Sequence, residues 1–322
     1  MQPPNIAAGR IVGVDNGWTA GMNTVRHPWL LRSDQYRRGL NIVNRGGVAQ
    51  TRPGFSMKLI LPPGNLQGMT YFRATKDNIN KDYLICAVNG NIYAIPFPLQ
   101  QPRSWESLRL KNLSFDSKAQ MVYFAIAEKS VTILEDATVQ LTPTYNVLMI
   151  QDGGITPAAF WDGEEQRHLL ESAPALETPR GSWMTFSGGR LWIARDKIII
   201  ASDIYDPLKF TERLEGEGRG DFSVPKEITG LTSFVGDGRT EIVTIFTEDR
   251  SEIIQSGIRD RASWPTTPNF QSILFPSTGC VAGRSICFQS GLMWWYSPGG
   301  LVASDAAASS NLTSQINYKD AE

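Results

Sequence analysis

Short runs of apolar residues, separated by two-residue polar turns, recur along most of this 322-residue chain. The clearest example is the pair of runs at residues 83–88 and 91–95, which are rich in β-branched and aromatic side chains and have Asn89-Gly90 between them. Both central positions of a tight hairpin turn need positive φ, which asparagine and glycine adopt most readily. The pattern therefore predicts a β-hairpin over residues 83–95.

The same order of strand, turn and strand returns four more times. The expected strands span 121–127 and 131–134, 183–186 and 191–194, 241–246 and 252–255, and 285–288 and 292–296, with further strands at 198–201 and 301–304. The hairpin turns near residues 89, 128, 188, 248 and 290 are 39 to 60 residues apart. A four-stranded propeller blade takes about 40 to 50 residues. Helical periodicity is confined to one modest candidate at 164–173, whose apolar part is Leu169 and Leu170.

These spacings predict an all-β fold, a β-propeller of about five to seven antiparallel blades that is closed with help from the N-terminal segment. A four-stranded blade buries both of its faces only when other blades stack against it. We expect an N-terminal extended segment at 1–50, the propeller at 51–310 with loop insertions near 143–179 and 212–226, and a polar tail at 311–322. A pair of β-sandwiches would also produce many short strands, but the return of one hairpin pattern at blade-sized intervals favours the propeller.

The charge balance argues against a free-standing nucleic-acid binder. Lys plus Arg is 31 and Asp plus Glu is 32, so the net charge is -1, whereas nucleic-acid binders usually have a basic excess. The N-terminal residues lack the basic and apolar regions of a signal peptide, and no run of 18 apolar residues predicts a membrane span. The three cysteines lack the CxxC spacing of a zinc site, so we expect three buried, reduced thiols.

Catalytic chemistry has little support in the sequence. The only histidines are His27 and His168, and neither lies in a metal-binding or nucleophile motif. Acidic residues cluster at Asp162, Glu164 and Glu165 and again at Glu215 and Glu217, but a glycosidase needs two carboxylates at a fixed separation across one bond. We interpret these clusters as solvated loop charges. The sequence predicts no catalytic residue, no cofactor and no metal site.

One group of residues suggests an interaction surface instead, and an aromatic run suggests packing between blades. The N-terminal segment is basic at Arg37, Arg38, Arg45 and Arg52, and arginine is enriched at protein interfaces. Direct nucleic-acid binding and plain surface charge are the alternatives for these arginines. In the run 294–296, strand alternation should place the first and third aromatic rings on one face and the middle ring on the other, as blade-to-blade packing requires.

The order of motifs near the N-terminus resembles the β-propeller structural proteins of tailed phages, above all the tail nozzle of short-tailed phages. The matching residues are Asn23, Pro28, Trp29 and Leu30 in the opening, then Asn41, Gly46, Gly47, Arg52, Pro53 and Gly54. Later matches are 245–248 with 251–254 and Gly257, and 279–282 with 285–286 and the run 294–300. The resemblance extends loosely from about residue 21 to 305. Nozzle proteins often carry extra domains at the distal tip or between blades, whereas the insertions expected here are short.

The resemblance implies a structural protein of the virion tail, assembled in the host cytoplasm. It implies a ring of six copies below the portal and adaptor, which extends the DNA ejection channel, binds tail fibre or tip proteins, and passes DNA without sequence-specific binding or membrane insertion. The interface and family-motif residues would be Asn23, Trp29, Arg37, Arg38, Asn41, Arg45, Arg52, Pro53 and Gly54. A carbohydrate-binding or glycoside-hydrolysing β-propeller is the alternative, and a cellular propeller scaffold is a third.

Overall fold

The structure is a computed structural model of the chain. It describes residues 57–311, with gaps at 58, 77–79, 131, 136–137, 142–143, 172–176, 212–220, 236–240, 290 and 306–308, and four short earlier strands. These earlier strands are β1 (Gly21–Met22), β2 (Gln35–Tyr36), β3 (Ile42–Arg45) and β4 (Val48–Thr51). Contacts divide the chain into two units, Met1–Met57 with Asn311–Glu322, and Lys58–Ser310.

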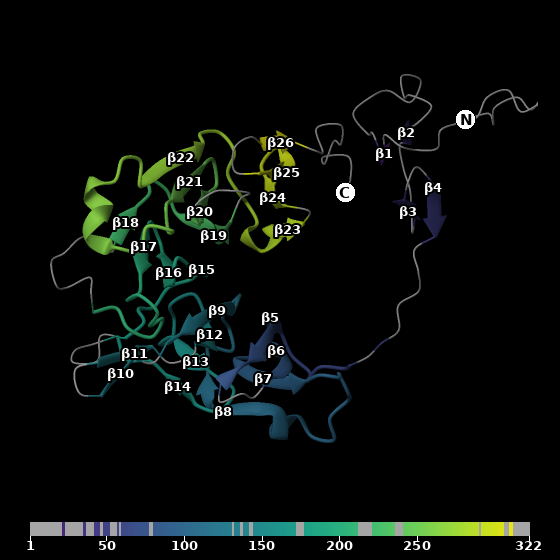
Figure 1. Ribbon diagram of the computed structural model, residues 1–322. Coiled ribbons are helices and arrows are strands. Elements are labelled where there is room, and N and C mark those ends of the chain that lie inside the picture. The colour runs from purple at the N-terminus through teal and green to yellow at the C-terminus, as the bar shows by residue number, and fades with distance from the viewer. Residues whose placement is uncertain are drawn as a thin grey trace, which may run out of the picture. The chain divides into compact units, whose positions relative to one another are not determined.

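Five four-stranded sheets follow one another along the described part of the chain after residue 65 (Figure 1). The first sheet contains β5 (Leu66–Ala74), β6 (Lys81–Val88), β7 (Asn91–Pro96) and β8 (Arg109–Ser114). The second contains β9 (Tyr123–Lys129), β12 (Tyr145–Gln151), β13 (Ala159–Trp161) and β14 (Gln166–His168). A separate hairpin, β10 (Thr132–Glu135) with β11 (Thr138–Leu141), is inserted between β9 and β12.

The remaining sheets repeat the arrangement. The third contains β15 (Met184–Ser187), β16 (Arg190–Arg195), β17 (Ile198–Ala201) and β18 (Asp221–Ser223). The fourth contains β19 (Ile228–Phe234), β20 (Ile242–Thr247), β21 (Ser251–Ile254) and β22 (Gln271–Phe275). The fifth contains β23 (Cys287–Gln289), β24 (Leu292–Ser297), β25 (Gly300–Ser304) and β26 (Ser309–Asn311). Short 3₁₀ helices lie at η3 (Trp105–Leu108), η5 (Arg261–Thr266) and η6 (Gly283–Ser285).

The predicted Asn-Gly hairpin is confirmed. Asn89 and Gly90 have φ values of 48° and 76°, and they join β6 to β7 in an antiparallel pair. A Cβ atom at position 90 would lie 2.2 Å from the Phe115 carbonyl oxygen, so this turn also needs glycine for close approach. The hairpins expected at 183–194, 241–255 and 285–296 are confirmed as β15–β16, β20–β21 and β23–β24.

Each pair of consecutive sheets shares its own hydrophobic core. The four cores lie between the first and second, second and third, third and fourth, and fourth and fifth sheets. In β12, for example, Leu148 and Ile150 belong to the first core, whereas Val147 and Met149 belong to the second. Strands buried on both faces read as continuous apolar runs, which explains the composition of these central strands.

The first strands of consecutive sheets lie next to one another. β5 contacts β9, β9 contacts β15, and β15 contacts β19, so these edge strands form the inner side of the arrangement. Sheets of four strands that stack face to face, with the first strand of each on the inside, define a β-propeller. The chain is therefore an all-β protein with a β-propeller fold. The range of five to seven blades, and closure by the N-terminal segment, stay predictions.

The prediction for the second sheet was wrong. The hairpin expected over 121–134 does not form, because β9 continues to Lys129 and pairs with β12 instead of the following run. The expected insertion at 143–179 contains β12, β13 and β14, and the helical candidate at 164–173 begins as strand β14. The range 212–226 likewise contains β18, the outermost strand of the third sheet. β13, β14 and β18 are only three residues long and lie next to turns, so their sequences have the composition of loops.

Candidate interaction surface

Most of the predicted interface residues lie outside the described residues. This holds for Asn23, Trp29, Arg37, Arg38, Asn41, Arg52, Pro53 and Gly54. Arg45 is the last residue of β3, where its backbone pairs with that of Val48. The positions of these side chains are therefore not described, and their role at an interface stays a prediction.

A row of exposed apolar side chains runs along β5, the innermost strand of the first sheet. Leu66, Met69 and Tyr71 are 48%, 57% and 48% exposed. They pair with Val88, Cys86 and Leu84 of β6, and residues that lie directly opposite share one face of a sheet. The Tyr71 ring also contacts that of Phe97, which is 45% exposed, with 6.0 Å between ring centroids. We call these four residues, Leu66, Met69, Tyr71 and Phe97, the β5 row.

A β-bulge keeps the β5 row on one face. The register between β5 and β6 shifts between Leu66 and Gly68, which adds one residue to β5 at this point. Without that extra residue, strand alternation would place Leu66 and Met69 on opposite faces. The bulge therefore extends the exposed apolar surface to the start of the strand.

The β5 row lies on the face of the first sheet that points away from the second sheet. The opposite face carries Phe72 and Ala74, which belong to the core shared with the second sheet. Farther from the inner edge, η3 covers part of the face that carries the β5 row. There Trp105 of η3 packs against Tyr93 of β7, with 5.7 Å between ring centroids. Among the described residues, no hydrophobic core joins this face to the fifth sheet.

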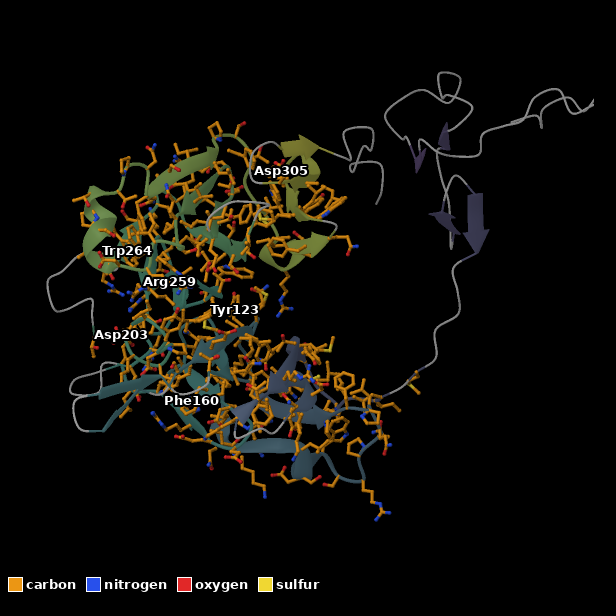
Figure 2. All side chains as sticks on the ribbon, in the orientation of Figure 1. Tyr123, Phe160, Asp203, Arg259, Trp264 and Asp305 are labelled. Atoms are coloured by element: carbon orange, nitrogen blue, oxygen red, sulfur yellow. The ribbon has the colours of Figure 1, made fainter. Side chains whose placement is uncertain are left out.

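A cavity of about 430 Å³ opens beside the β5 row, on the inner side of the propeller. Its walls come from the first strands of three sheets and from η6, and they include Leu66, Met69, Tyr123, Trp183, Met184 and Arg284. The rings of Tyr123 and Trp183 meet edge to face at 4.8 Å between centroids. Tyr123, at the start of β9, lies toward the middle of the arrangement of sheets (Figure 2). We call this cavity the inner pocket.

Arg284 is the charged residue of the inner pocket. Its Nη2 atom donates a hydrogen bond to the Gln67 carbonyl oxygen of β5, which links η6 to the first sheet. Across the described chain, this is its only hydrogen bond or ion pair. Burial raises the pKa of Tyr123, and the nearby positive charge of Arg284 acts in the opposite direction.

The acidic cluster at Asp162 is structural. Asp162 is buried, its Oδ2 atom lies 2.8 Å from Lys76 Nζ, and its Oδ1 atom accepts hydrogen bonds from the backbone of Glu164 and Glu165. Lys76 follows β5 of the first sheet. Asp162 therefore fixes the β13–β14 turn and links the second sheet to the first. Glu215 and Glu217 lie outside the described residues.

His168 also has a structural role. A backbone N–H can only donate, so Nε2 of His168 accepts the 3.4 Å hydrogen bond from Ser114 N. Its Nδ1 atom then carries the proton and donates to the Pro157 carbonyl oxygen at 3.0 Å. His168 thus links β8 of the first sheet to the second sheet. His27 lies outside the described residues.

The three cysteines differ in exposure. Cys86 and Cys280 are buried free thiols, and burial raises the pKa of Cys86 to about 11. Cys287 is exposed, so the prediction of three buried thiols was wrong for this residue. Its strand, β23, is the inner edge of the fifth sheet, where one side of the strand has no neighbour in the sheet.

The aromatic run in β24 alternates as predicted. Trp295 is fully buried in the fourth core, against Phe246 and Phe275, and its indole nitrogen donates to the Gly279 carbonyl oxygen at 3.0 Å. Trp294 lies on the other face and is half-buried. Packing between sheets explains the buried ring, as expected.

Two buried arginines between the third and fourth sheets had no sequence signal. The guanidinium carbons of Arg190 and Arg261 lie 5.3 Å and 5.1 Å from the centroid of the Trp264 ring. Both side chains donate to the Ser202 carbonyl oxygen, at 2.8 Å and 2.9 Å. Carbonyl oxygens and an aromatic ring thus help to stabilise two buried cations.

The described residues lack the features of two other kinds of site. They contain no cluster of three or more His, Cys, Asp or Glu residues that could hold a metal ion. They also contain no helix of the length and apolar character needed to cross a membrane.

No protein-family model matches this chain, and no curated protein matches it. Among solved structures, it is similar to BBS1N in two crystal structures of BBS1N in complex with ARL6DN. The structure soaked with lead has a TM-score of 0.41 and 11% identity, and the match covers 79% of this chain and 69% of that one. The structure soaked with mercury has a TM-score of 0.35 and 9% identity, with 78% and 82% covered. Similarity at this level carries no argument about function.

Proposed function

We propose that this protein is a structural subunit of a phage tail. In this proposal, six copies form a ring, the nozzle of a short-tailed phage, below the portal and adaptor. The ring extends the DNA ejection channel and offers attachment surfaces for fibre or tip proteins. The role is assembly, with no catalytic step.

The β5 row is the observation that supports an assembly role. Contiguous apolar patches on a protein surface mark interaction sites, because water contact with large apolar side chains is unfavourable. Four such side chains lie together at a sheet face that shares no described core with the fifth sheet. The four packed cores supply the rigidity that a ring subunit needs, and the motifs at 21–54 point to the phage nozzle as the class of ring.

A neighbouring copy is the partner that we propose for the β5 row. A contact between two different surfaces of identical subunits generates a closed ring when the rotation between subunits closes. The β5 row can take part in such a contact, since it belongs to the first sheet and the loop after β7 and its side chains are exposed among the described residues. Subunit contact would bury the exposed rings of Tyr71 and Phe97.

The test measures mass and shape of the purified chain, alone and with virion connector complexes, by light scattering and negative-stain microscopy. We expect sixfold rings, formed either alone or on the connector. Phe97→Glu should weaken assembly by about 30-fold or more, the effect of losing an interface hot spot worth about 2 kcal/mol. Ile273→Glu is the matched control, because Ile273 is also exposed but lies on β22, the outer strand of the fourth sheet. A monomer that ignores connectors, or equal effects of the two variants, would contradict the proposal.

A further inference from the structure

The inner pocket combines one cation with apolar and aromatic walls. Its volume of about 430 Å³ falls within the range of about 300 to 1,000 Å³ that is usual for ligand sites. Trp183 and Tyr123 form one wall, and Met69 and Leu66 form another. None of the described residues that line the pocket is acidic, so Arg284 is its only formal charge.

Arg284 is held in place but keeps unused donors. The bond from Nη2 to the Gln67 carbonyl oxygen fixes the guanidinium beside β5. A guanidinium has five N–H donors, and its planar fork matches the two oxygens of a carboxylate. The single described bond of Arg284 therefore leaves enough donors for a bidentate contact with an anion.

We infer that the inner pocket binds a peptide segment that presents a carboxylate beside an apolar side chain. The carboxylate contacts Arg284, and the apolar side chain lies between Met69 and the Tyr123–Trp183 pair. One cation among apolar walls suits such a peptide better than a nucleic-acid strand, which needs a track of several cations along its phosphates. The pocket shares Leu66 and Met69 with the β5 row, but binding of the peptide does not require the ring.

Calorimetry with small probes tests the inference on the full chain. The probe is N-acetyl-leucyl-phenylalanine with a free carboxylate, and its C-terminal amide is the uncharged control. We expect the free acid to bind at least about tenfold more tightly than the amide, since hydrogen bonds between two charged groups are stronger than those to a neutral amide. Arg284→Gln should remove that difference. Arg103→Gln is the matched control, because Arg103 is exposed in the β7–β8 loop, outside the pocket, and should leave the difference unchanged.

A second variant covers the case in which Arg284→Gln weakens the fold by breaking the bond to β5. Met69→Glu changes an exposed residue and adds a negative charge to the pocket, so it should also abolish binding of the free acid. Equal binding of acid and amide, no binding of either at millimolar concentration, or tighter binding of an oligothymidylate than of the peptide would overturn the inference. Phe97→Glu leaves the pocket lining intact, so failure of ring assembly and failure of peptide binding are separate results.

Discussion

Truncation of Trp264 should destabilise the propeller strongly. Trp264 is 3% exposed and lies in the core between the third and fourth sheets. Its ring centroid lies 5.6 Å from that of Trp192 and 5.1 Å from that of Phe270, and two guanidinium groups lie over it. Its indole nitrogen also donates to the Ile258 carbonyl oxygen at 2.7 Å.

The expected loss follows from these contacts. Replacing a buried tryptophan by alanine costs about 3–5 kcal/mol, and Trp264→Ala should lie near 4–5 kcal/mol because the cavity adjoins two buried cations. Trp264→Phe keeps an aromatic ring against the same neighbours but removes the hydrogen bond to Ile258, so it should cost about 1–2 kcal/mol. The difference between the two variants measures ring packing apart from the hydrogen bond.

Urea unfolding followed by far-UV circular dichroism gives the free energies of unfolding, since the signal does not depend on the deleted indole. Trp105→Ala is a matched control at a half-buried tryptophan and should cost less than Trp264→Ala. The reasoning would be refuted by a loss below about 2 kcal/mol for Trp264→Ala, or by equal losses for the alanine and phenylalanine variants.

Two further predictions concern a turn and an ion pair. Gly188 has φ +64°, and a Cβ atom there would lie 1.8 Å from the Ser256 carbonyl oxygen, so Gly188→Ala should lower the free energy of unfolding in urea by at least about 2 kcal/mol. Gly291 has φ +74° but open space around it, so Gly291→Ala should lower the free energy of unfolding by about 1 kcal/mol. Hydrogen bonds from Arg167 lower the pKa of Glu177 from its ordinary value of 4.5. The ionised pair therefore contributes fully to stability above pH 4.5, and this contribution is lost as the pH falls through the lowered pKa of Glu177 in the folded state. Wild type should therefore lose more stability than Glu177→Gln between about pH 6 and about pH 3. Parallel pH profiles would exclude a role for the pair.

The sequence predicted the parts of the fold that depend on local turns. Asn89-Gly90 and the Gly188-Gly189 pair both adopt positive φ, and each lies between two runs that do pair as a hairpin. The second sheet could not be predicted this way, because the true partner of β9 follows an inserted hairpin. β13 and β14 are also only three residues long, too short for a pattern of apolar alternation.

The candidate surfaces depend on contacts that local sequence does not encode. Met69 and Tyr71 look like ordinary core positions in a strand, and only the absence of a described neighbouring core shows that they are exposed. Arg284 and Gln67 are 217 residues apart, so their contact forms only when the sheets between them have folded. The bulge near Gln67 is the one local feature that has a sequence signal, because Gly68 lies within the strand and glycine in a strand often accompanies a bulge.

The cores shared by consecutive sheets have a consequence for synthesis on the ribosome. A sheet that has just emerged can pack against the previous one, but its other face stays bare until the next sheet has been made. A further sheet needs about 50 residues, and at about 5–20 residues per second this takes roughly 2 to 10 seconds. The nascent chain therefore always has one uncovered apolar sheet at its growing end, and this is where a chaperone that binds apolar segments would act.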